Sequence, residues 1–132
     1  MEQLAVEIVG LCREYGECRV EVERMEEARR VKNALESVCA MARQRLDISD
    51  PALLLALLDA CEVTRDEGML QEVLDVVGRN LDRLAVSAES VKLLACCYYY
   101  VEEEECVERA GRMLEELRKM GRGEEELADV ET

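Results

Sequence analysis

The residues most suggestive of chemistry lie together in the stretch "LACCYYYVEEEEC", residues 94 to 106. This stretch holds three of the seven cysteines of the chain, three adjacent tyrosines and four adjacent glutamates. Thiolates bind soft metals and act as nucleophiles, and carboxylates bind hard metals or transfer protons. Each of these chemistries requires a particular spacing, which can be compared with the sequence.

Metal binding does not fit the spacing. Zinc sites usually combine Cys with His at C-x2-4-C spacing, whereas Cys96 and Cys97 are adjacent and would point about 100° apart on a helix. The chain has no histidine, which excludes di-iron sites of the Glu-x-x-His type. The glutamate run lacks the alternating Asp or Asn residues and the central Gly of a calcium loop. We therefore expect no metal and no cofactor.

Catalysis by these residues is also disfavoured. A cysteine nucleophile normally needs a histidine or another base, and the sequence has no Cys-x-x-Cys redox pair. Among 31 acidic residues no carboxylate pair can be singled out for acid–base chemistry. The sequence predicts a protein that is not an enzyme, with an unrecognised enzyme as an alternative.

The composition indicates which elements carry these residues. The chain is 49% hydrophobic and contains one proline and seven glycines in 132 residues, which favours an all-α protein rich in good helix formers. We expect five or six helices, arranged either as stacked helical hairpins or as an irregular bundle. Residues 1–121 should form a single domain, and residues 122–132 an acidic tail that stays disordered.

Apolar periodicity and capping residues predict where the helices lie. We expect helices over residues 2–15, 22–46, 51–63 and 64–83, and further helical structure from 88 to 120. Gly16 should end the first helix, and Asp50 and Ser87 should cap the helices that follow them. Thr64 and Glu67 fit a capping box.

The long segment from 88 to 120 leaves two possibilities open, one curved helix or two helices. It contains no typical turn residue before Gly111. A helix that begins near Glu103 would place several glutamates at its positive N-terminal end, whereas a continuous helix would suffer repulsion between them. The charge pattern therefore favours a turn within "VEEEEC".

A turn at this place makes the chain a series of three hairpins. When residues 53–83 are aligned with the residues 37 positions later, "LLLALLDACEV" lies opposite "SVKLLACCYYY", and most apolar positions match. The motif Leu94-Ala95-x-x-Tyr98 resembles the first helix of a tetratricopeptide-type repeat, and by relation of a pentatricopeptide repeat, with Leu57-Leu58-x-x-Cys61 as a degenerate counterpart. The resemblance implies an adaptor that holds a peptide or helix in a concave groove.

The net charge limits the class of partner. At −14 the chain should repel phosphate backbones and anionic membranes, which argues against the RNA-binding branch of this resemblance. We expect a protein partner with a basic surface, in a non-enzymatic interaction module or a small subunit of a larger assembly. Self-association as a homodimeric structural bundle is the alternative. No targeting segment is visible, so we expect a cytoplasmic protein.

In a stack of hairpins the first helix of each pair lines the concave face. The residues of these helices that point away from the core are the candidate partner-binding residues. They are Leu55, Asp59 and Glu62 on the helix from 51, and Lys92 and Tyr99, together with Glu89 and Cys96, on the helix from 88.

The cysteines have two interpretations. Free cysteines are often small buried hydrophobic residues. However, 14 Arg, only two Asn and three Gln suit a hyperthermophile or a GC-rich genome, and intracellular disulfides persist in hyperthermophiles. The candidates for a disulfide are Cys12, Cys18, Cys39 and Cys61. Cys18, in a connector, is the natural partner for one of the others, and the adjacent Cys96 and Cys97 are the least suitable pair.

Overall fold

The computed structural model describes residues 2–121, and within this range the chain forms six α-helices, two 3-10 turns and no strand. The helices are α1 (Glu2–Cys18), α2 (Met25–Arg43), α3 (Pro51–Thr64), α4 (Glu67–Arg79), α5 (Ala88–Val101) and α6 (Glu104–Lys119). The 3-10 turns are η1 (Val22–Arg24) and η2 (Leu81–Arg83). The predicted all-α class is confirmed. The acidic tail expected at residues 122–132 lies outside the described residues.

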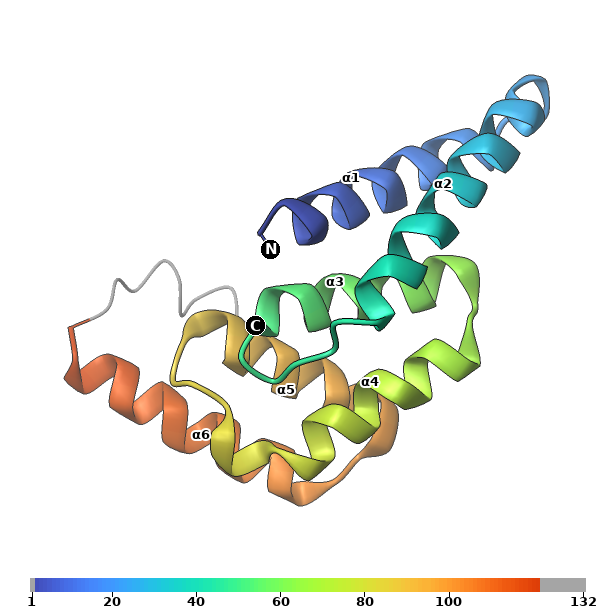
Figure 1. The fold of residues 1–132 in the computed structure, drawn as a ribbon. Coiled ribbons are helices and arrows are strands. Elements are labelled where there is room, and N and C mark those ends of the chain that lie inside the picture. The colour runs from blue at the N-terminus through green and yellow to red at the C-terminus, as the bar shows by residue number, and fades with distance from the viewer. Residues whose placement is uncertain (1, 122–132) are drawn as a thin grey trace.

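Consecutive helices pack as hairpins, α1 with α2, α3 with α4, and α5 with α6. The first helices of the three hairpins also pack against one another in the order α1, α3, α5, and they follow one another down the molecule in Figure 1. Of the two arrangements expected from the sequence, this packing corresponds to stacked hairpins. One hydrophobic core runs through all six helices.

The second and third hairpins share the same local geometry 37 positions apart. The starts of α3 and α5 are separated by this interval, and so are the starts of α4 and α6. Between the helices, Arg65 and Glu102 both adopt the left-handed conformation, with φ of 59° and 52°. The backbone N–H of each donates to the carbonyl four residues earlier, Cys61 or Tyr98. The repeat proposed from apolar matches is therefore also present in the backbone.

The segment from 88 to 120 consists of two helices, so the predicted turn is confirmed and the single curved helix is wrong. Helix α5 ends at Val101 and α6 begins at Glu104. Glu104 and Glu105 lie in the first turn of α6, where the helix dipole favours negative charge.

Two predicted helix starts are confirmed by hydrogen bonds. The side chain of Asp50 accepts from the backbone N–H of Leu53 at 3.2 Å, and Oγ of Ser87 accepts from the N–H of Ser90 at 3.1 Å. Both bonds satisfy N–H groups that have no partner within the helix.

The predicted capping box at Thr64 is wrong. Thr64 is the last residue of α3, and its Oγ1 donates to the carbonyl of Ala60 at 2.8 Å. Asp66 caps α4 instead and accepts from the N–H of Met69 at 3.0 Å.

The prediction that Gly16 ends the first helix is also wrong, because α1 continues to Cys18, whose side chain is fully buried. The long helix expected from residue 22 begins at Met25, after η1, and ends at Arg43.

Two arginines join neighbouring parts of the stack. Arg43 of α2 binds the carboxylate of Glu72 of α4 through two hydrogen bonds and lies 3.7 Å from the carboxylate of Asp66. Arg109 of α6 donates to the carbonyls of Leu81 and Leu84, both at 3.2 Å, and so holds the link between α4 and α5. These contacts join the first hairpin to the second, and the third hairpin to the link that precedes it.

Candidate functional site

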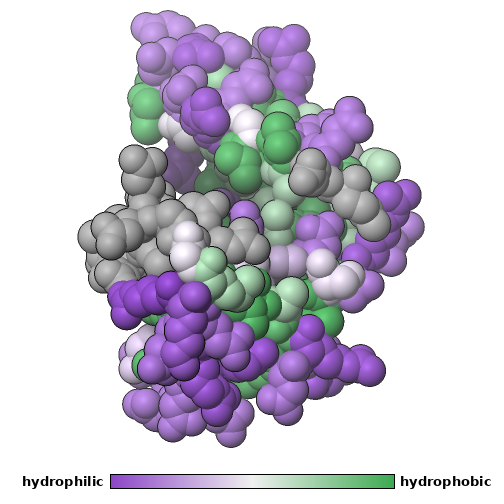
Figure 2. Space-filling model, turned by 90° about the vertical axis from the view of Figure 1, so that its left-hand side faces the viewer, coloured by the Kyte–Doolittle hydropathy of each residue, from purple (hydrophilic) through white to green (hydrophobic). Residues whose placement is uncertain are grey.

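A groove of about 360 Å³ lies between α1 and α3. Its walls are apolar over most of their length, with Val6 and Val9 on α1 facing Ala52 and Leu55 on α3. Val6 is 71% exposed and Val9 40% exposed, although both line a groove beside the core. Figure 2 shows apolar residues at the surface across the middle of the molecule, between strongly hydrophilic upper and lower parts. The groove is therefore open to solvent although its walls are largely aliphatic.

Gly10 widens the groove on the α1 side. A Cβ atom at this position would meet no atom within 4 Å. A glycine in a helix interior costs about 0.5–1 kcal/mol relative to alanine. Nothing in the packing around Gly10 requires the absence of a side chain, and its effect is to leave space above α1.

Asp59 is the acidic group at the α3 wall. The surface of the residue is exposed, yet its position beside apolar walls raises the pKa of its carboxyl group through desolvation. Within residues 2–121 no side chain or backbone group forms a hydrogen bond or an ion pair with it. Its charge contributes, after burial, to the raised pKa of Cys12 and Cys96. Asp59 is thus a carboxylate that a cation could stabilise.

Two more charged side chains border the groove. Glu89 reaches it from the first turn of α5, and Arg13 lies on α1. The residues that line the groove therefore include two carboxylates and one guanidinium group.

A second group of predicted residues lies further along α3 and α5. The hydroxyl of Tyr100 donates to the carboxylate of Glu62 at 2.9 Å and joins α5 to α3. Tyr99 is 74% exposed and packs edge-on against the ring of Tyr100, with the ring centroids 5.2 Å apart. Hence Glu62 has a structural partner, whereas the ring of Tyr99 is largely free for contact.

We call the outward residues of α1, α3 and α5 the front face; they are Val6, Val9, Gly10, Arg13, Ala52, Leu55, Asp59, Glu62, Glu89, Lys92, Cys96 and Tyr99.

The structure places four of the five predicted partner-binding residues in two groups. Leu55 and Asp59 lie in the groove, whereas Glu62 and Tyr99 belong to the aromatic end of the face. Lys92 is half-buried on α5, at the position 37 residues after Leu55.

The α1 side of the groove was not predicted. The apolar spacing in the sequence puts Leu4, Ile8, Leu11 and Cys12 on one side of this helix and gives Val6 and Val9 no role. One signal was present, because "LAVEIVGLC" matches "LLLALLDAC" and puts Val6 at the position of Leu55.

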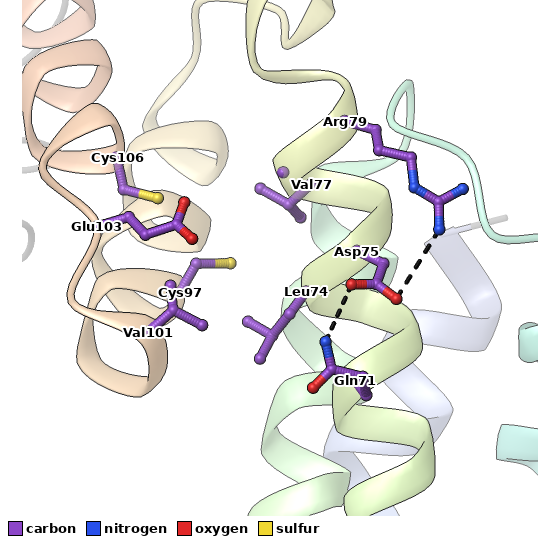
Figure 3. A pocket seen from close by; sticks show the side chains of 10 residues that line it. Gln71, Leu74, Asp75, Val77, Arg79, Cys97, Val101, Glu103 and Cys106 are labelled. Carbon is purple, nitrogen blue, oxygen red and sulfur yellow. Dashed lines mark hydrogen bonds and ion pairs between the residues drawn. The ribbon is translucent and has the colours of Figure 1, made fainter.

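A smaller hollow of about 280 Å³ lies between α4 and the α5–α6 turn (Figure 3). Its polar groups on α4 are paired with one another, since Asp75 accepts from Gln71 at 2.9 Å and lies 3.8 Å from Arg79. Burial raises the pKa of the Cys97 thiol to about 12 and also raises that of Cys106. Both thiols are therefore protonated at neutral pH, whereas a reactive cysteine is a thiolate. Within residues 2–121 no group of three or more potential ligands has a geometry that could hold a metal ion.

The structure separates the four candidate disulfide cysteines. Burial raises the pKa of Cys12 to about 11 and those of Cys39 and Cys61 to about 12. Cys12 contributes to the raised pKa of both Cys39 and Cys61. All three belong to the core, one each on α1, α2 and α3, and these helices pack against one another. Cys18 lies elsewhere, beside Arg24 and Glu27. It follows Cys12 by about 9 Å along the helix axis, too far for a disulfide between them.

The disulfide hypothesis predicts the number of free thiols. All seven cysteines are thiols in the structure. If the protein comes from a hyperthermophile, alkylation of the unfolded, unreduced chain should label five thiols or fewer, and mass spectrometry of the digest should find a bridge among Cys12, Cys39 and Cys61. Labelling of all seven would rule out a disulfide.

Comparisons of the sequence with family models and with curated proteins, and of the fold with solved structures, give no significant match. None of the helices described has the length and apolar character needed to cross a lipid bilayer. The case for a function therefore rests on the geometry of the front face.

Proposed function

We propose that the protein is a non-enzymatic interaction module, acting as an adaptor or as a small subunit of a larger assembly, and that it holds a protein partner on its front face. The observation that carries this proposal is the open groove between α1 and α3, whose aliphatic walls include Val6 at 71% exposure. Clustered exposed apolar side chains with a polar rim are typical of interaction sites. The resemblance of residues 51–120 to tetratricopeptide-type hairpins supports the same conclusion.

The charge supports a protein partner with a basic surface. The chain carries −14 overall, and both Asp59 and Glu89 border the groove. Complementary charge speeds association and selects among partners. The same charge disfavours nucleic acid, whose binding depends on lysine and arginine contacts to phosphates.

Changing both ends of the front face should abolish capture of a partner. We expect a double variant with Leu55→Ser and Tyr99→Ser to lose the proteins that the wild type retains in a quantitative pull-down. Helicity and melting temperature should change little, because Tyr99 is 74% exposed and Leu55 is only half-buried. The matched control is Val107→Ser with Met120→Ser, which removes two exposed apolar residues away from this face. Equal retention by both double variants would contradict the proposal.

The mass in solution separates an adaptor from a structural homodimer. A monomer by light scattering supports the adaptor. A dimer that the Leu55→Ser, Tyr99→Ser variant dissociates would show that the face serves self-association instead.

A further inference from the structure

We infer that the groove between α1 and α3 takes a basic amphipathic helix from a partner protein, with an apolar side chain over Val6 and Leu55 and a lysine or arginine paired with Asp59. This inference rests on the proposed function and specifies the chemistry of the partner. Three features of the groove carry it: its shape, the composition of its walls and its charge.

The shape and composition select a helix among the common peptide-binding modes. Residues 2–121 form no strand, so this part of the chain offers no sheet edge to which an extended peptide could add. Proline-rich segments bind between aromatic side chains, and none of the described residues lining the groove is aromatic. The remaining common mode is a helix that lays its apolar side into an aliphatic groove between two helices.

The open space at Gly10 suits this mode. Gly10 follows Val6 by one turn on the same side of α1, and a Cβ atom there would meet nothing within 4 Å. A side chain of the partner can therefore approach the backbone of α1 at Gly10, next to Val6.

The charge selects a basic partner. Asp59 has no hydrogen-bond or ion-pair partner within residues 2–121, and Glu89 adds a second carboxylate at the α5 edge, so the lining holds two carboxylates against the one guanidinium group of Arg13. A cation between them would gain two electrostatic contacts in a partly desolvated place.

Two occupants from the chain itself are disfavoured by like charge. A second copy of the chain would add a further net charge of −14 and would be repelled. Residues 122–132 contain five acidic residues and one arginine, so they also carry the wrong sign.

The test uses a synthetic 18-residue peptide made of leucine and lysine at helical spacing, labelled with a fluorophore, and fluorescence anisotropy at physiological salt. We expect Gly10→Leu, which fills the groove, and Asp59→Asn, which removes the charge, each to weaken binding about tenfold or more. The matched controls are Gly78→Leu, a glycine of α4 that also has open space, and Asp82→Asn, an exposed acid of η2. Both controls should bind as the wild type does.

A peptide of the same pattern with glutamate in place of lysine should not bind. Equal binding by the wild type and all four variants would mean general attraction to an acidic surface and would overturn the inference. No binding of the lysine peptide at about 100 µM would also overturn it, because the Kd would then lie well above that concentration. The proposed function has a separate outcome. If a natural partner is lost with Leu55→Ser and Tyr99→Ser but is unaffected by Gly10→Leu and Asp59→Asn, the front face binds protein but not in this groove.

Discussion

Replacing Leu94 with alanine should lower the free energy of unfolding by about 2–5 kcal/mol. The side chain is 0% exposed at the centre of α5, where this helix packs on α3 and α6. The loss combines the transfer of the leucine side chain out of the core with the cavity that it leaves. Urea unfolding followed by circular dichroism measures the change.

The matched control at the same site is Leu94→Met, which keeps the volume and should cost less than about 1.5 kcal/mol. Leu57, 37 positions earlier and also 0% exposed, should respond to alanine in the same way. A loss below about 1 kcal/mol for Leu94→Ala would show that this position is not a centre of the core.

Replacing Arg109 with methionine should cost about 1.5–3 kcal/mol, because hydrogen bonds from a charged donor to the carbonyls of Leu81 and Leu84 are lost. Both carbonyls belong to the link between α4 and α5, and both bonds are 3.2 Å long. Methionine keeps much of the apolar stem, so the change in stability reports mainly the loss of the guanidinium group. Thermal and urea unfolding report the loss.

Arg112→Met on the same helix is the control, since this side chain is exposed. Lysine at 109 should recover only part of the stability, because an ammonium group cannot reproduce the fixed fork of a guanidinium group. Equal stability of the two methionine variants would contradict the role assigned to Arg109.

The break between α5 and α6 shows how much of the fold the sequence could predict. No glycine, proline or asparagine marks the turn, yet the glutamates indicated it, because four like charges favour a helix start over a helix interior. The residue at the turn, Glu102, has a φ of 52°, which is uncommon for a side chain with a Cβ. Charge thus predicted the position of the turn but not its backbone conformation.

Where local signals competed, the sequence predicted the wrong residue. The Thr64–Glu67 pattern has a rival two positions later in Asp66, which accepts from the N–H of Met69, while the Thr64 hydroxyl donates back to the carbonyl of Ala60 within α3. A glycine such as Gly16 ends a helix only where the residues after it gain no stability from being helical. Burial of Cys18 at 0% exposure offsets the cost of a glycine in the helix, which is about 1 kcal/mol.

Helical periodicity places Leu55 and Asp59 away from the core, and a stack of hairpins then puts them on a common face with Lys92 and Tyr99. Periodicity does not state which helix lies beside α3. The first hairpin does not follow the 37-residue interval, so the proximity of α1 and its valines to Leu55 follows only from the packing of the helices.

The order α1, α3, α5 has a consequence for how the molecule comes apart. In such a linear array each hairpin is stabilised mainly by the neighbour it touches, so opening starts at the ends and spreads inward. The groove lies at the junction of the first and second hairpins, with Glu89 of the third hairpin at its edge. An occupant would therefore act as a clamp across that junction, and hydrogen exchange in α1 would slow together with exchange in α3 when the groove is filled.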